Sequence, residues 1–248
     1  MRHGRGPNTA DEDAKRPSRE RENLVAERTR ISNRLKSALA RLGIRGFKPM
    51  LRKAPQRLAA LRTLEGVPIP PNTVAEMQRD MARLAVLREQ IEEIERARLQ
   101  ALQQAANSGP HAMVRLLARI VGVGIETADM LVHEVLTRNL RDRRAVARYV
   151  GLTGTPDESG SKRREKGLAK SGNSRVRRGL IQLAWRFLRF QKNSALARWY
   201  RARTEGPKGA RKTTMIVGLA RKLLIALWRM ARTGVVPVGV ELRQLASA

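Results

Sequence analysis

The feature that most constrains the fold is a long run of apolar residues with helical spacing between residues 72 and 106. The apolar positions recur mostly at steps of three and four, and most residues between them are Arg, Glu or Gln: Val74, Met77, Met81, Leu84, Leu87, Ile91, Ile94 and Leu102. Such spacing places one narrow apolar stripe along a helix, which must pack against a partner. With Asn72 or Thr73 as its cap, the run predicts a long helix that is stable only beside a second one.

An earlier stripe supplies the partner. Between Pro17 and Gly43 the apolar positions again follow helical steps: Leu24, Ile31, Leu35, Ala38 and Leu42. Glycine is common just beyond a helix C-terminus, so Gly43 marks the expected end. The two helices predict an antiparallel coiled-coil hairpin over residues 18–106, which we call the stalk. A plain helical bundle remains open as the structural interpretation. A spacer or dimerisation arm, through which a homo-oligomer would form, remains open as the functional one.

The rest of the chain predicts more helices and no sheet. Residues 1–17 are polar and rich in Gly, Pro and charge, which is typical of a disordered tail. The breaker sequence before residue 111 predicts a domain boundary, followed by a C-terminal domain over residues 111–248. Its residues 173–233 predict a helical wall, and no alternating strand pattern is evident. The sequence therefore predicts an all-α fold.

Residues 111–137 predict two apolar helices joined at Gly122-Val123-Gly124. Glycines allow a tight turn there, and the helix that follows presents free backbone N–H groups at its start. This arrangement resembles a helix-hairpin-helix, in which Gly122 and Gly124 would hold a nucleic-acid phosphate. A sharp helix–helix connection without a ligand is the alternative.

Residues 151–172 form a glycine-containing segment that is dense in positive charge. Ser159 follows Asp157 and Glu158, and a run of cations comes next: Lys162, Arg163, Arg164, Lys166, Lys170, Arg175, Arg177 and Arg178. A basic segment with little apolar content is poorly suited to a core and well suited to phosphate. We predict a basic serine loop whose cations, with the arginines that follow it, bind nucleic acid.

The composition of the whole chain points to the same partner. Lys and Arg number 51 against 22 Asp and Glu, a formal charge of +29, which attracts a polyanion. The absence of cysteine excludes disulfides and thiolate sites, and three histidines at unrelated spacings indicate no metal site. Arg221, Lys222 and Arg229 interrupt the longest apolar stretch, so no membrane partner is expected. A cytoplasmic, nucleoid-associated protein is the resulting expectation.

Several motifs in order resemble a known family. These are Tyr149–Thr153, Asp157–Gly160, Lys170–Asn173 and Arg175–Arg178, together with the Gly-Val-Gly turn. Their order and spacing resemble the C-terminal transposase domain of the insertion-sequence-110 family, also called Piv-like or DEDD transposases. The resemblance covers nearly the whole chain from Asp11 onward.

The resemblance implies a specific chemistry at Ser159. Members of the family pair an N-terminal RuvC-like domain, whose carboxylates bind Mg²⁺, with a C-terminal serine that attacks a DNA phosphodiester. Ser159 occupies the matching position, whereas Ser161 and Ser171 are nearby alternatives away from it. Nearby cations would stabilise charge on the phosphoryl oxygens. From the residues alone, a turn residue before Gly160 is the favoured interpretation of Ser159. Some members are guided by RNA, so DNA and a guide RNA are the implied partners.

The chain departs from the family in lacking the acidic domain ahead of the stalk. The Asp11–Asp13 segment lies at the helix entry and matches none of the metal-binding positions. The resemblance therefore implies an N-terminally truncated transposase, with no cofactor of its own, whose catalytic activity alone is open. A non-catalytic nucleic-acid-binding remnant is the alternative function. A coiled-coil scaffold with incidental charge is a third, which predicts no affinity for nucleic acid.

Overall fold

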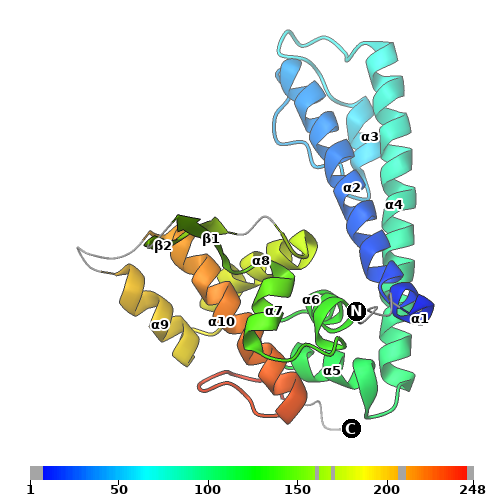
Figure 1. Ribbon diagram of the computed structural model, residues 1–248. Helices are drawn as coiled ribbons and strands as arrows, with labels where there is room; N and C mark the ends of the chain where they lie inside the picture. Colours follow the sequence, from blue (N-terminus) through cyan, green and yellow to red (C-terminus); the bar gives the residue numbers. More distant parts are fainter. Residues whose placement is uncertain (1–7, 160–161, 169–170, 206–210, 245–248) are drawn as a thin grey trace. The chain divides into compact units, whose positions relative to one another are not determined.

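The computed structural model describes residues 8–159, 162–168, 171–205 and 211–244 (Figure 1). These residues form helices and a single pair of short strands, so the predicted all-α class is confirmed apart from that pair. The chain divides into two compact units, residues 16–101 and residues 1–15 with 102–248. The division falls within helix α4 (Pro71–Gln104). None of the described helices combines the length and the apolar content that a membrane span requires.

The unit of residues 16–101 is built on α2 (Arg16–Arg41) and most of α4, with the short α3 (Ala54–Ala59) beside them (Figure 1). Arg34 on α2 binds Asp80 on α4 through two hydrogen bonds of 2.5 and 2.9 Å. Nearer the start of α2, Arg21 binds Glu95, which lies further along α4. The residue that lies earlier in α2 pairs with the residue that lies later in α4. Helices α2 and α4 therefore run antiparallel.

The apolar stripes predicted from the sequence form the core of this unit. Ile31, Leu35 and Leu39 of α2 are buried with Met77, Met81, Leu84 and Leu87 of α4. Gly43 ends α2 with φ +77°, and a Cβ there would lie 2.0 Å from Cγ of Leu64. Glycine is thus required by both backbone and packing at the predicted helix end.

The N-terminal segment differs from the predicted disordered tail. Within the described part of residues 1–17, helix α1 (Thr9–Asp13) is capped by the Asn8 side chain, and α2 begins at Arg16. The prediction overlooked Asn8, whose side chain accepts a hydrogen bond from the backbone N–H of Ala10 and satisfies a free donor of the first turn.

The second unit contains most of the helices. They are α5 (Gly109–Ala118), α6 (Ile125–Leu131), the π-helix η1 (Val132–Leu136), α7 (Arg143–Val150), α8 (Ser174–Phe190), α9 (Ala195–Thr204) and α10 (Lys212–Thr233). Helix α10 packs against α8 and α9, and α8 also contacts α6 and α7 (Figure 1). Leu180, Leu183 and Phe187 of α8 share one core with Leu223 and Leu227 of α10. Helix α8 therefore has one face in the core and the other outward.

The basic segment of residues 151–172 is a two-stranded ribbon where a loop was predicted. Strand β1 (Gly154–Ser159) pairs antiparallel with β2 (Lys162–Leu168), from Gly154 opposite Leu168 to Ser159 opposite Lys162. Gly172 has φ +88°, and a Cβ there would lie 2.6 Å from the backbone N of Gly151. This close approach holds the two ends of the segment together. The strands lack apolar alternation, so the pattern that predicts strands was missing.

Candidate nucleic-acid interface

The turn between α5 and α6 (residues 119–124) contains the two glycines that the sequence singled out, and they have different surroundings. Gly122 has φ +93°, and a Cβ there would lie 3.1 Å from Cβ and Cδ2 of Phe190. The fold itself thus requires Gly122. Gly124 precedes α6 with an ordinary φ of −85°, and nothing lies within 4 Å of the position of its Cβ. The approach to the start of α6 is therefore open at Gly124.

Gln191 holds this turn from within the protein. Its fully buried side chain donates from Nε2 to the carbonyls of Val121 (2.8 Å) and Glu241 (3.0 Å). Its Oε1 accepts from the backbone N–H of Glu241 at 2.8 Å. One of these bonds reaches the turn and two reach Glu241, so Gln191 links the turn to the C-terminal segment around Glu241. The burial of Gln191 was not predicted, because a single glutamine at the end of a basic helix gives no signal of burial in the sequence.

The C-terminal segment adds a second attachment. The Arg243 guanidinium donates to the carbonyls of Ala118 and Val123, the latter at 3.2 Å. Leu242 and Ile120 form an isolated antiparallel bridge. The carbonyls of Val121 and Val123 in the turn are thus bonded within the protein.

Helix α8 presents a polar and aromatic face next to this turn. Its exposed positions at steps of four, three and four residues are Arg178, Gln182, Trp185 and Arg189. We call this set the exposed face of α8. The helix contains no acidic residue, so nothing on α8 itself offsets the charge of this face. The neighbouring Arg186 donates to Oγ1 of Thr127 in α6 at 3.1 Å, which ties the face to the helix after the turn.

The other end of α8 is joined to the base of the ribbon. The Asn173 side chain caps α8 by accepting from the backbone N–H of Val176, and the backbone N–H of Asn173 donates to the Tyr149 carbonyl at 2.9 Å. The Arg138 guanidinium lies 4.6 Å from the centre of the Tyr149 ring. Helix α8 therefore connects the turn at one end with the ribbon at the other.

Arg175, predicted to bind nucleic acid, has a partner inside the fold. Its Nη1 donates to Oε1 of Glu134 at 2.8 Å, and the Arg175 and Glu134 side chains are only 16% and 2% exposed. Asn173 donates to the other carboxylate oxygen at 3.1 Å. Glu134 lies in the π-helix η1, and the sequence analysis missed it because single acids are usually solvent-exposed. This contact fixes the start of α8 onto η1.

The remaining predicted residues fall into three groups. Arg177 donates to the Ser171 carbonyl at 3.0 Å, and Arg178 is exposed. On the ribbon, Arg163 lies opposite Glu158, Arg164 opposite Asp157 and Lys166 opposite Thr155. Lys170 and Ser161 lie outside the described residues.

Ser159 pairs with Lys162 at the end of the ribbon furthest from its base. At about 3.3 Å per residue, Ser159 lies roughly 17 Å along the strand from Gly154. The pairing brings the predicted nucleophile position and the predicted cations onto one short element.

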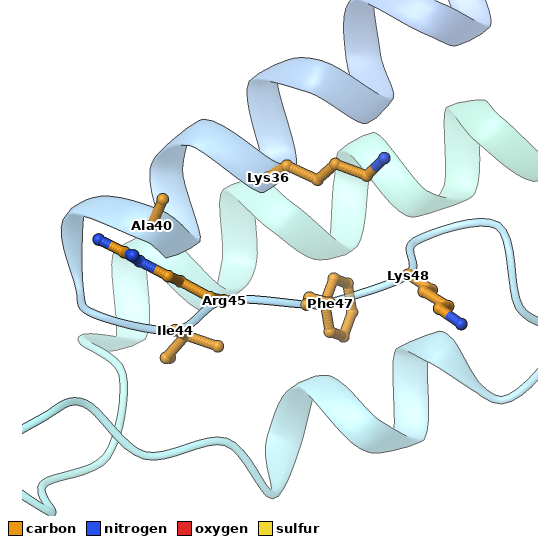
Figure 2. Close-up of a pocket in the computed structure, with 7 residues that line it drawn as sticks. Lys36, Ala40, Ile44, Arg45, Phe47 and Lys48 are labelled. Atoms are coloured by element: carbon orange, nitrogen blue, oxygen red, sulfur yellow. The ribbon is translucent and has the colours of Figure 1, made fainter.

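A separate basic pocket lies in the other unit, after α2. It has a volume of about 420 Å³ and is lined by Lys36, Ala40, Ile44, Arg45, Gly46, Phe47 and Lys48. Figure 2 shows the three positive side chains extending in different directions around Phe47. The three positive side chains do not point toward one another, so the pocket is a weaker candidate than the exposed face of α8.

Comparisons with known proteins agree on one class. Residues 114–200, from α5 to α9, match the family model described as "Transposase IS116/IS110/IS902 family". The second unit therefore contains a transposase domain. The chain is 40% identical over 247 residues to "Putative transposase y4rJ" of Sinorhizobium fredii, covering 96% of this chain and 62% of that protein.

A second relative extends the match. The chain is 29% identical over 239 residues to "Transposase for insertion sequence element IS1328" of Yersinia enterocolitica, covering 93% of this chain and 66% of that protein. The chain thus spans just under two thirds of the length of both relatives. It belongs to the IS116/IS110/IS902 transposase family, which is the family its sequence motifs resemble.

Proposed function

We propose that this chain acts in DNA transposition, binding DNA and a guide RNA and attacking a DNA phosphodiester with the Ser159 hydroxyl. The observation that carries the proposal is the ribbon register, which sets Ser159 opposite Lys162 and beside the Arg163 and Arg164 positions. Family membership supplies the class of reaction, and the charge of +29 suits the polyanionic substrate.

The proposed step is a transesterification. The serine hydroxyl releases its proton to solvent as its oxygen forms a bond to phosphorus. The bond from phosphorus to a deoxyribose oxygen breaks, and that oxygen leaves and takes up a proton. The covalent phosphoserine keeps the energy of one phosphodiester for rejoining. Cations at Lys162 and Arg163 would stabilise the charge that develops on the non-bridging oxygens.

Mg²⁺ is implied by the family, and the described residues do not fit it. They contain no group of three or more His, Cys, Asp or Glu side chains that could hold a metal ion. The buried carboxylate of Glu134 is bonded to Arg175 and Asn173 instead. No step of the proposal is therefore assigned to a metal.

The proposal extends to self-association through the stalk. Val86 and Leu99 are exposed apolar residues on α4, with exposed fractions of 52% and 44%. A second copy of the chain packed against such positions would remove them from water. Sedimentation of the wild type and of Val86→Glu would measure this, and the same monomeric mass for both would contradict it.

A suicide substrate tests the serine step. A DNA strand with a bridging phosphorothiolate releases a thiolate that rejoins poorly, so a covalent adduct accumulates. Wild type is expected to form this adduct and Ser159→Ala to form none, while Ser171→Ala, the matched control in the same segment, keeps it. Equal trapping by wild type and Ser159→Ala would contradict the assignment.

The alternative function is a nucleic-acid-binding protein that does not cut DNA. It is favoured by the position of Ser159 at the far end of the ribbon, about 17 Å along the strand from Gly154. Retained binding with no adduct, over a range of substrates, would select this alternative. Binding under both functions should weaken steeply with salt.

A further inference from the structure

Trp185 is the one tryptophan in the described residues whose ring is not covered by a cation. Arg203 and Lys222 lie over the Trp199 ring at 5.1 and 4.8 Å, and Arg232 lies over Trp228 at 4.9 Å. No such contact is found for Trp185 within the part of the chain that the structure describes, and 46% of its surface is exposed. A large aromatic side chain is thus left open to solvent on a rigid helix.

The ring is nevertheless held in place. It meets the ring of Tyr200 edge to face, with centroids 6.4 Å apart and planes at 73°. Tyr200 belongs to α9 and is only 5% exposed, so it forms a fixed support. A supported aromatic ring that still exposes nearly half its surface costs little conformational entropy when it binds a flat partner.

The surroundings of Trp185 define the charge of that partner. Arg178 and Arg189 lie on the same face, about 10 Å before and about 6 Å after Trp185 at 1.5 Å rise per residue. Gln182, one turn earlier, adds amide donors and an acceptor. Positive groups on both sides of an aromatic ring suit a strand with phosphates on both sides of one base. An acidic peptide would match the charge but would offer no flat ring at each step.

We propose that Trp185 stacks on an unpaired base of a nucleic-acid strand that lies along the exposed face of α8. The inference rests on the proposed nucleic-acid function and specifies its ligand as single-stranded or locally unpaired. In a duplex the faces of the bases are covered by their neighbours, so only an unpaired base offers a face to the indole ring.

Fluorescence anisotropy tests the proposal. It measures binding to fluorescein-labelled single strands and to duplexes of the same sequence. The free energy of base–aromatic stacking predicts that Trp185→Ala weakens single-strand binding roughly 5- to 150-fold. Binding to duplex should change little. Trp185→Phe should retain most of the affinity, while Trp185→Leu, which keeps apolar area without a ring, should not. Trp228→Phe is the matched aromatic control and should change neither affinity.

The salt dependence separates stacking from charge. Trp185→Ala should leave the slope of log affinity against log salt unchanged, whereas Arg189→Gln should lower it for both ligands. In a variant that retains only Trp185 (Trp199→Phe with Trp228→Phe), single strands should quench the indole fluorescence. Thermal unfolding confirms that each variant is folded.

Equal losses for single strand and duplex in Trp185→Ala, or no loss for either, would overturn the stacking site. In that case, salt-dependent binding by the wild type would leave the proposed function standing. Failure of the wild type to bind any nucleic acid at low salt would instead remove both proposals.

Discussion

The buried pair of Glu134 and Arg175 allows the sharpest test of how the fold supports the interface. Glu134→Gln keeps the shape of the side chain and an oxygen that can still accept from Asn173, and it removes the charge that faces Arg175. The Arg175 guanidinium, 16% exposed, then loses its buried counter-ion. Breaking a buried pair from one side typically costs 3–5 kcal/mol, and the retained oxygen places this change near the lower end, at about 3 kcal/mol.

The second half of the test is a double-mutant cycle. Arg175→Met removes the ion pair from the 2%-exposed Glu134 carboxylate, to which Asn173 still donates, so we expect a loss of about 3 kcal/mol. Combining Glu134→Gln with Arg175→Met removes both charges, and the loss should be smaller than the sum of the single losses by about 2 kcal/mol.

Urea unfolding followed by tryptophan fluorescence measures these values. All three tryptophans (Trp185, Trp199 and Trp228) lie in the second unit, so their emission reports on that unit. Arg189→Met is the matched control, because Arg189 is exposed on the same helix. It should leave stability within about 0.5 kcal/mol of wild type. Single losses below about 1 kcal/mol, or strictly additive losses, would refute a structural role for Arg175.

Three further predictions follow from other contacts. Gln191→Ala removes three hydrogen bonds and should cost about 3 kcal/mol; hydrogen exchange should accelerate at the Glu241 amide, and unchanged exchange would contradict the clamp. Gly122→Ala should cost about 1–3 kcal/mol because of its φ and the contact with Phe190, while Gly124→Ala, in open space, should be nearly neutral in the same urea assay. A hydrogen bond from Arg34 holds the pKa of Asp80 below its usual value, so the stabilisation is present above about pH 4 and is lost as pH falls through the lower folded value. Circular dichroism of acid unfolding should show this loss in wild type and not in Asp80→Asn.

The sequence predicted those parts of the fold in which burial follows a regular period. The stripes of α2 and α4 are an example, because Leu35, Leu39 and Met81 recur at helical steps among charged residues. The break after the stalk and the Gly-Val-Gly turn were also visible, since glycine and proline interrupt helical patterns. The Asn8 cap was visible in principle and was overlooked.

The sequence could not predict features that depend on contacts between distant segments. The ribbon has no apolar face, so only backbone pairing between Asp157 and Arg164 and their neighbours identifies it. Gln191 and Glu134 are buried by residues about 40–70 positions away, which no local pattern records. For the same reason Arg175 looked like its neighbours Arg177 and Arg178, although its side chain has an internal acidic partner.

Helix α8 makes the turn and the ribbon parts of one surface. Phe190 at its C-terminal end packs on Gly122, and Asn173 at its N-terminal end is bonded to Tyr149 near the end of α7, which leads into the ribbon. Its 17 residues span about 26 Å at 1.5 Å per residue, a rigid distance between the two. A strand bound along the exposed face would therefore keep a fixed register between the turn and the ribbon. Because Ser159 lies about 17 Å further along β1, the ribbon sets the remaining distance to the scissile phosphate in the proposed reaction. A register shift of one pair in the ribbon would move Ser159 by about 3 Å, enough to abolish in-line attack while leaving binding along α8 intact.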